Sequence, residues 1–169
     1  MPKVQLPSTP RGRKRLLRLA DMLMKNSRNK KGARFDYGDW GTVDNAGQKP
    51  KMNCGTTGCA LGLAAISGRF RGLGFYIEPD SYHIQIGLDQ PGFDPRRGST
   101  DHIEVGAKYF EITLNQSSHI FGGNVPCDDN NTEGAKAERT VAKAIRQFVK
   151  GKYKPLMSFE PDPDEGLYN

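Results

Sequence analysis

Apolar residues recur at helical spacing near both ends of the chain. In residues 11–26, the positions on one helical face are Leu16, Leu19, Ala20 and Leu23. Near the other end, a second apolar stripe consists of Val141, Ala144, Ile145, Phe148 and Val149. This spacing predicts an amphipathic helix at each place. Thr132 is expected to cap the second helix, which ends near Gly151.

The pattern changes in the middle of the chain. Small apolar residues run almost without interruption over residues 57–67, which predicts a short helix that is buried on all sides and ends at Gly68. Apolar residues then alternate with polar ones over 74–87, on both sides of the segment Glu78-Pro79-Asp80-Ser81. Proline and aspartate favour turns, so this stretch predicts a two-stranded hairpin.

Two further helices are expected after the hairpin. Ser99 or Thr100 is placed to cap a helix that runs through Phe110. The segment Thr113-Leu114-Asn115-Gln116 then has the spacing of a capping box, and the glycines at 122 and 123 end the short helix that it starts. Together the elements predict an α+β fold, a mainly helical single domain with one buried central helix and a two-stranded β-hairpin.

The domain organisation follows from length and composition. A chain of 169 residues suits one domain. We expect an extended arm over 1–10, one globular domain over 11–152 and an acidic tail over 153–169. No apolar run approaches the ~20 residues that cross a bilayer, and the amino terminus has no apolar signal core. Three cysteines do not form a secreted disulfide framework, so a cytoplasmic protein, bacterial or in an infected host cell, is expected.

Positive charge is concentrated at the amino terminus. Residues 1–34 contain eleven Lys or Arg and a single acid, Asp21, whereas the whole chain has a net charge of +6. The exposed positions of the first helix that carry this charge are Arg11, Arg13, Lys14, Arg15 and Arg18. We expect this basic face to contact a nucleic acid or an acidic protein, or only to keep the helix solvated. No aromatic residue precedes Phe35, so base stacking is not expected there.

The segment Asn53-Cys54-Gly55-Thr56-Thr57-Gly58-Cys59 leads directly into the predicted buried helix. Glycine backbone, threonine hydroxyls and the amides of a helix start can bind a phosphorylated small molecule. The ligand-binding residues would be Gly55, Thr56, Thr57 and Gly58, with cations supplied by Arg69, Arg71, Arg96 or Arg97.

The same segment allows an enzymatic alternative. If a helix begins at Thr56 or Thr57, its dipole lowers the pKa of the Cys54 thiol just outside it. His83 would then be the base, oriented by Asp80 or Asp101, in a cysteine-dependent hydrolase or transferase.

A metal site is a weaker interpretation of the cysteines. The candidate zinc ligands are Cys54, Cys59, Cys127 and His119. The Cys-x₄-Cys spacing lacks the second pair of ligands that zinc sites usually show, so no metal or other cofactor is expected. Cys59 is better interpreted as a small buried hydrophobe.

The aromatic and acidic residues of 35–40 are given structural roles. Phe35 and Trp40 are expected to anchor their loop in the core, because large aromatic side chains contribute chiefly by burial. Asp36 and Asp39 are expected to cap local turns.

Several short motifs occur in a characteristic order. They are Leu19-Ala20-Asp21, Phe35-Asp36-Tyr37-Gly38-Asp39-Trp40, Cys54-Gly55-Thr56-Thr57-Gly58-Cys59-Ala60-Leu61-Gly62, and Tyr109-Phe110 through Ile120-Phe121-Gly122. In this order the chain resembles a family of small, uncharacterised bacterial and phage proteins with a Cys-Gly-Thr-x-x-Cys-x-x-Gly core motif. Leu63 stands where members of that family often have Trp. The resemblance implies a prokaryotic or viral origin and a fold, and it implies no activity.

We therefore expect a small accessory protein that acts by binding, of a host-takeover or anti-defence type. Its target is an acidic macromolecule on the basic face or a phosphorylated ligand at Cys54–Gly58. The enzymatic alternative stays open, as does the oligomeric state.

Overall fold

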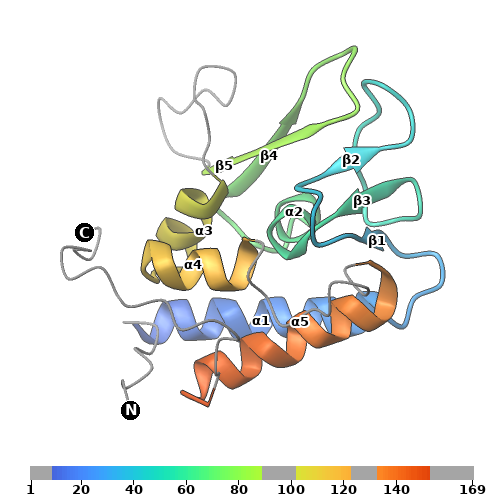
Figure 1. Ribbon diagram of the computed structural model, residues 1–169. Helices are drawn as coiled ribbons and strands as arrows, with labels where there is room; N and C mark the ends of the chain where they lie inside the picture. Colours follow the sequence, from blue (N-terminus) through green and yellow to red (C-terminus); the bar gives the residue numbers. More distant parts are fainter. Residues whose placement is uncertain (1–8, 89–101, 123–132, 153–169) are drawn as a thin grey trace.

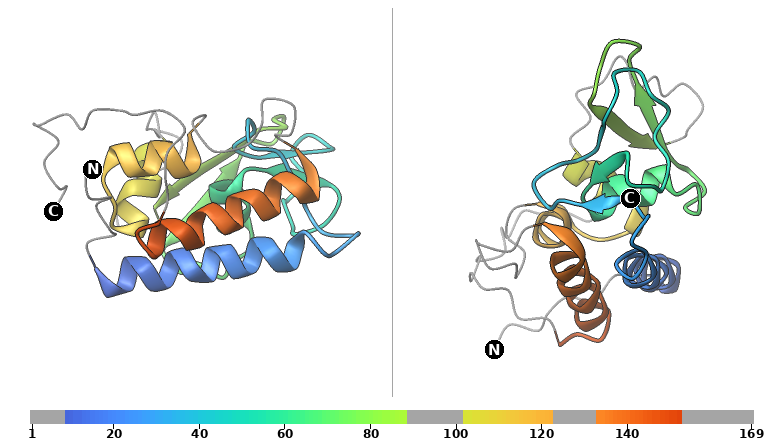
Figure 2. Two further views of the ribbon diagram at one scale, coloured as in Figure 1. Left: turned by 60° about the horizontal axis from the view of Figure 1, so that its bottom comes forward. Right: turned by 90° about the vertical axis from the view of Figure 1, so that its right-hand side faces the viewer.

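Two long antiparallel helices form one side of the molecule (Figures 1 and 2). The computed structural model describes residues 9–88, 102–122 and 133–152. Within it, α1 spans Pro10–Asn26 and α5 spans Gly134–Val149. An ion pair between Asp21 and Arg146 joins the two helices.

The sequence predicts both helices correctly. Proline occupies the first position of α1, where no intrahelical donor is needed, and the Thr9 side chain accepts a hydrogen bond of 3.0 Å from the Gly12 amide. Thr9 therefore belongs to the helix start, although we placed it in the arm. The predicted apolar faces of both helices are buried, apart from half-buried Val149. Residues 1–8, Thr132 and the acidic tail lie outside the described residues.

The third helix, α2 (Ala60–Ile66), is the buried centre of the fold. All seven of its residues are buried, and it contacts α1 on one side and strands of both sheets on the other (Figure 1). The buried central helix is thus confirmed, but its predicted start at residue 57 is wrong. Thr56–Gly58 forms a strand, β3, and Cys59 precedes the helix in extended conformation. β-Branched threonines favour that extended state.

β3 is the centre of a small mixed sheet that the sequence did not predict. β1 (Arg34–Phe35) pairs with it in parallel, and β2 (Thr42–Val43) pairs with it antiparallel. Thr57 faces Arg34 on one side and Thr42 on the other. The sheet brings three loop-like segments together beside the end of α1.

The predicted hairpin is confirmed. β4 (Leu73–Ile77) and β5 (Ile84–Leu88) are antiparallel, and the Ser81 amide donates to the Glu78 carbonyl across the predicted turn at 3.0 Å. A backbone bridge between His83 and Thr42 connects the hairpin to the first sheet.

α3 (His102–Phe110) and α4 (Leu114–Phe121) pack on each other beside the central helix (Figure 1). The Thr113 and Gln116 side chains accept from each other's backbone amides at 3.1 and 3.0 Å, which confirms the capping box. Ser99, Thr100 and Gly123 lie outside the described residues. No helix in the described ranges has both the length and the apolarity needed to cross a membrane.

Candidate ligand-binding site

The Cys54–Gly58 segment does not lie at a helix start. Cys54 is exposed, but it precedes β3 instead of a helix, so the expected effect of a helix dipole on its thiol has no basis. Thr56 is buried, and its hydroxyl accepts from the Lys51 amide at 3.2 Å. Gly58 is also buried, within β3. The segment therefore does not present the free amides of a helix start, on which the predicted phosphate site depended.

The second cysteine is closed off from solvent. Cys59 is 1% exposed, as expected for a small buried hydrophobe. Burial raises the pKa of its thiol to about 11, so the thiolate that a nucleophile requires is disfavoured.

The predicted base is not joined to the predicted nucleophile. His83 is exposed at the end of the hairpin, where its amide donates to Ser81 Oγ at 3.0 Å. Within the described ranges, no hydrogen bond links its imidazole to Cys54. Arg96, Arg97, Asp101 and Cys127 lie outside those ranges. The described residues also include no group of three or more His, Cys, Asp or Glu arranged to hold a metal ion.

Three of the five cations on the predicted basic face contact the rest of the protein. Arg11 forms an ion pair with Glu111. Arg15 donates to the Tyr109 carbonyl oxygen at 2.6 Å, and its guanidinium lies 4.3 Å from the centre of the Tyr109 ring. Arg18 lies over the ring of Phe70 at 5.9 Å. These contacts fix the first half of α1 onto the core and leave only Arg13 and Lys14 without such a contact among the described residues.

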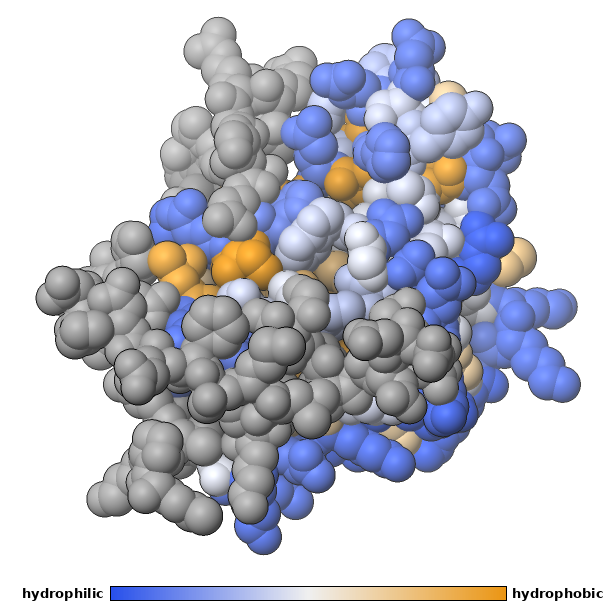
Figure 3. All heavy atoms as spheres, viewed as in Figure 1, coloured by the Kyte–Doolittle hydropathy of each residue, from blue (hydrophilic) through white to orange (hydrophobic). Residues whose placement is uncertain are grey.

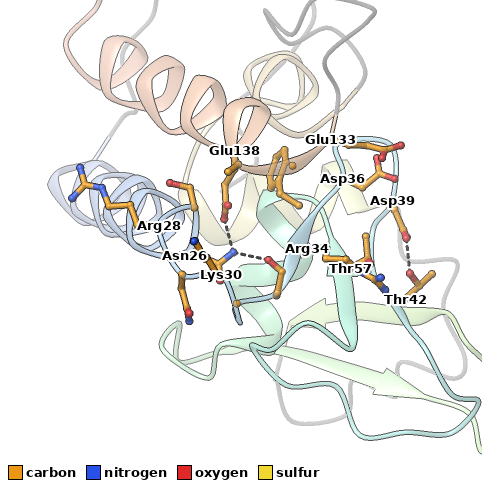
Figure 4. A pocket seen from close by; sticks show the side chains of 17 residues that line it. Asn26, Arg28, Lys30, Arg34, Asp36, Asp39, Thr42, Thr57, Glu133 and Glu138 are labelled. Atoms are coloured by element: carbon orange, nitrogen blue, oxygen red, sulfur yellow. Dashed lines mark hydrogen bonds between the residues drawn. The ribbon is translucent and has the colours of Figure 1, made fainter.

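A pocket of about 790 Å³ lies between the end of α1, β1 and the start of α5 (Figure 4). Arg28 and Lys30 lie on the same side of it as Asn26. The acidic residues Asp36, Asp39 and Glu133 are gathered on the other side (Figure 4). The pocket therefore has a basic end and an acidic end.

Asn26 and Glu138 form a buried polar contact at the wall of this pocket. Asn26 Nδ2 donates to Glu138 Oε1 and to the Ala33 carbonyl oxygen, both at 2.8 Å (Figure 4). Because both neighbours are acceptors, the orientation of the Asn26 amide is fixed. Glu138 is 2% exposed, and burial raises the pKa of its carboxyl to about 7, although the Asn26 hydrogen bond and the Arg139 charge oppose the shift.

At the acidic end of the pocket, Asp36 and Asp39 already accept hydrogen bonds within their own turns. Asp36 Oδ1 accepts from the Gly38 amide at 2.9 Å. Asp39 accepts from the Gly41 amide at 3.0 Å and from the Thr42 hydroxyl at 2.7 Å. The expectation that these two aspartates cap local turns is confirmed.

A second hollow of about 400 Å³ lies on the other side of Asn26. Three cations line it, Lys25, Arg28 and Arg69, and no lining residue is acidic. None of the three forms an ion pair with a described residue. Figure 3 shows mostly hydrophilic residues along the right-hand edge, over the end of α1 and the loop after it. Lys30 and Lys31 extend the positive charge along that loop.

We call the five exposed cations around the end of α1 the basic surface; they are Lys25, Arg28, Lys30, Lys31 and Arg69. Sequence reasoning counted four of them in the charge of the amino-terminal segment and offered Arg69 as a cation for a bound phosphate. It assigned the contact surface to the first half of α1 instead.

Sequence reasoning missed Asn26 and Glu138 altogether, although a signal was present. Asn26 follows Leu23 by three positions, and Glu138 precedes Val141 by three and Ala142 by four. Both polar residues therefore fall on apolar helical faces.

Comparison of the chain with protein-family models, with curated proteins and with solved structures gives no match.

Proposed function

We propose that this protein acts by binding the phosphate groups of a nucleic acid on the basic surface. The supporting observation is the acid-free hollow lined by Lys25, Arg28 and Arg69, whose positive charges no described acid neutralises. Lysine and arginine that contact phosphates release condensed counterions, and this release supplies most of the affinity of sequence-independent binding.

Polar side chains favour phosphate as the ligand. Asn29 and Ser67 line the same hollow and offer hydrogen-bond donors beside the cations. An interface with an acidic protein would need a large apolar anchor at its centre. The exposed large apolar residues in the described ranges are Leu17 and Tyr82, and neither lines the hollow.

A binding role also agrees with the arrangement of the cysteines. The exposed thiol, Cys54, has no hydrogen-bonded base among the described residues, and Cys59 is buried. We therefore favour binding over the hydrolase or transferase alternative. An accessory protein of the host-takeover or anti-defence type, as expected above, would act through such a contact.

Charge reversal at two positions tests the proposal. We expect Arg28→Glu/Arg69→Glu to weaken the binding of a fluorescent single-stranded oligonucleotide at least about tenfold in an anisotropy titration, because two phosphate contacts become repulsive. The matched control is Arg13→Glu/Lys14→Glu, which changes the net charge equally on the first half of α1. Equal losses in the two variants would show only a general effect of charge, and full retention in the first variant would exclude the basic surface.

A further inference from the structure

The pocket beside the basic surface is lined by a carboxylate oxygen that receives no hydrogen bond from a described residue. Glu138 Oε1 receives the Asn26 hydrogen bond, but Oε2 receives none from any described residue. The side chain is 98% buried and lines the pocket. An unpartnered carboxylate oxygen at the pocket wall can accept a hydrogen bond, so this wall favours a ligand group that presents an N–H.

At the end of the pocket near Asn26, the nearby cations favour an anionic ligand group over a cationic one. Arg28 and Lys30 lie on the side of Asn26 and would repel an ammonium or guanidinium group (Figure 4). The carboxylates of Asp36 and Asp39 already accept hydrogen bonds from their turns. A neutral donor next to an anionic group fits this arrangement better. An amino-bearing nucleobase with its phosphate is a ligand of that chemistry.

The pocket adjoins the basic surface directly. Asn26, Arg28 and Asn29 line both this pocket and the acid-free hollow. A volume of about 790 Å³ is in the range of small-molecule sites, and Phe35 adds an apolar side chain to the lining. A single nucleotide can therefore place its phosphate on the surface and its base in the pocket.

We infer that the pocket receives an unpaired, amino-bearing base of a single-stranded nucleic acid, which donates its exocyclic amino group to Glu138 Oε2 while its phosphate contacts Arg28. This inference rests on the proposed function, and it adds base selection to phosphate binding. Adenine, cytosine and guanine carry such an amino group. Uracil and thymine have a single N–H between two carbonyl oxygens, which the carboxylate repels.

The experiment compares oligodeoxycytidylate with oligodeoxyuridylate of equal length, which have the same backbone and the same number of phosphates. Binding is measured by anisotropy at pH 8, where the Glu138 carboxyl is mostly ionised and Oε2 is an acceptor. We expect the wild-type protein to bind the cytosine oligomer at least about tenfold more tightly, as expected for one additional hydrogen bond to a charged group.

Glu138→Gln reverses the chemistry of the wall with little change in shape. The Gln amide oxygen must face Asn26 Nδ2, so its NH₂ group faces the pocket and favours the carbonyl oxygen of uracil. We expect the preference for cytosine to be lost or inverted. The matched control is Glu78→Gln, which makes the same change in an exposed residue of the hairpin turn, away from both hollows. This control should keep the cytosine preference.

The outcomes separate the two proposals. Equal binding of the two oligomers by the wild type, with the loss in Arg28→Glu/Arg69→Glu intact, would overturn base selection and leave phosphate binding in place. Absence of binding to both oligomers would overturn both proposals. If the Gln variant does not fold, as judged by circular dichroism, the wild-type comparison alone decides.

Discussion

Glu138 lies on the apolar face of α5, where its carboxyl meets Asn26 at the end of α1. The two residues are 112 positions apart in the chain, and each belongs to a helix whose other inward-facing residues are apolar. The hydrogen bond satisfies one carboxylate oxygen, and the packing of the two helices removes the side chain from water. Burial of the carboxyl costs stability whenever it is charged, and the Asn26 hydrogen bond offsets only part of that cost.

The buried carboxyl should make folding stability depend on pH. The pKa of Glu138 is raised to about 7 in the folded protein from an ordinary value of 4.5. The folded state therefore holds this proton more tightly than the unfolded chain, and stability falls as the pH rises from about 4.5 to 7. The full loss amounts to about 3.5 kcal/mol at most, since one pKa unit corresponds to about 1.4 kcal/mol.

Urea denaturation at pH 5 and pH 8 measures this effect. We expect the wild-type free energy of unfolding to be lower at pH 8, and Glu138→Gln to reduce the difference between the two values. Glu78→Gln again serves as the control, because Glu78 is exposed. The same pH dependence in wild type and Glu138→Gln would contradict the assignment.

At the scale of elements, the position of α2 depends on one close approach. Gly62 lies against the carbonyl oxygen of Trp40, where a methyl group on the glycine would overlap that oxygen. The approach places α2 under the loop that carries Asp36 and Asp39, so it also positions the acidic end of the pocket.

Gly62→Ala should therefore destabilise the protein. Inserting a methyl into a packed core typically costs about 1–3 kcal/mol, and here the neighbour is backbone, which cannot rotate away. The control is Gly38→Ala, since a methyl at exposed Gly38 meets only the Asp36 side chain at 3.5 Å. Chemical denaturation at one pH measures both changes. If Gly62→Ala were as stable as Gly38→Ala, α2 could shift away from the Trp40 carbonyl oxygen without a loss in the free energy of unfolding.

Sequence patterns predicted the elements that are long enough to show a period. The helices at both ends, the hairpin and the capping box at Thr113 each contain several residues that repeat a helical, strand or cap signal. β1 and β2 have two residues each, too few for alternation to be visible. The threonines at 56 and 57 were assigned to the helix because they adjoin an apolar run.

The candidate site was less predictable than the fold. The sequence analysis took Cys54 and the glycines around it as the site because they share a short segment. The pocket is instead built by residues from distant segments, which only the pairing of α1 with α5 brings together. The sequence shows that Asn26 and Glu138 fall on apolar helical faces, but it does not show that the two side chains contact each other.

At the scale of the whole molecule, the cations of α1 fall into two groups, those that contact the rest of the fold and those that remain exposed. Three arginines in its first half contact Tyr109 of α3, Glu111 just after it, and Phe70, and so stabilise the fold; they are Arg11, Arg15 and Arg18. Lys25 at its end and the cations of the loop after it remain exposed. The exposed positive charge is thus concentrated at one end of the molecule, where we propose that phosphates bind.

The salt dependence of binding tests this division. A single strand releases about 0.7 counterions for each phosphate that a protein neutralises, so about four contacts from the basic surface predict a slope of about −3 for log K against log salt concentration. Anisotropy titrations across a range of sodium chloride concentrations give the slope for wild type and variants. Arg28→Glu/Arg69→Glu should flatten it by about half, because two of those contacts are lost. Arg13→Glu/Lys14→Glu should leave it close to the wild-type value. A slope near zero in the wild-type protein, or the same flattening in both variants, would mean that the end of α1 is not where phosphates bind.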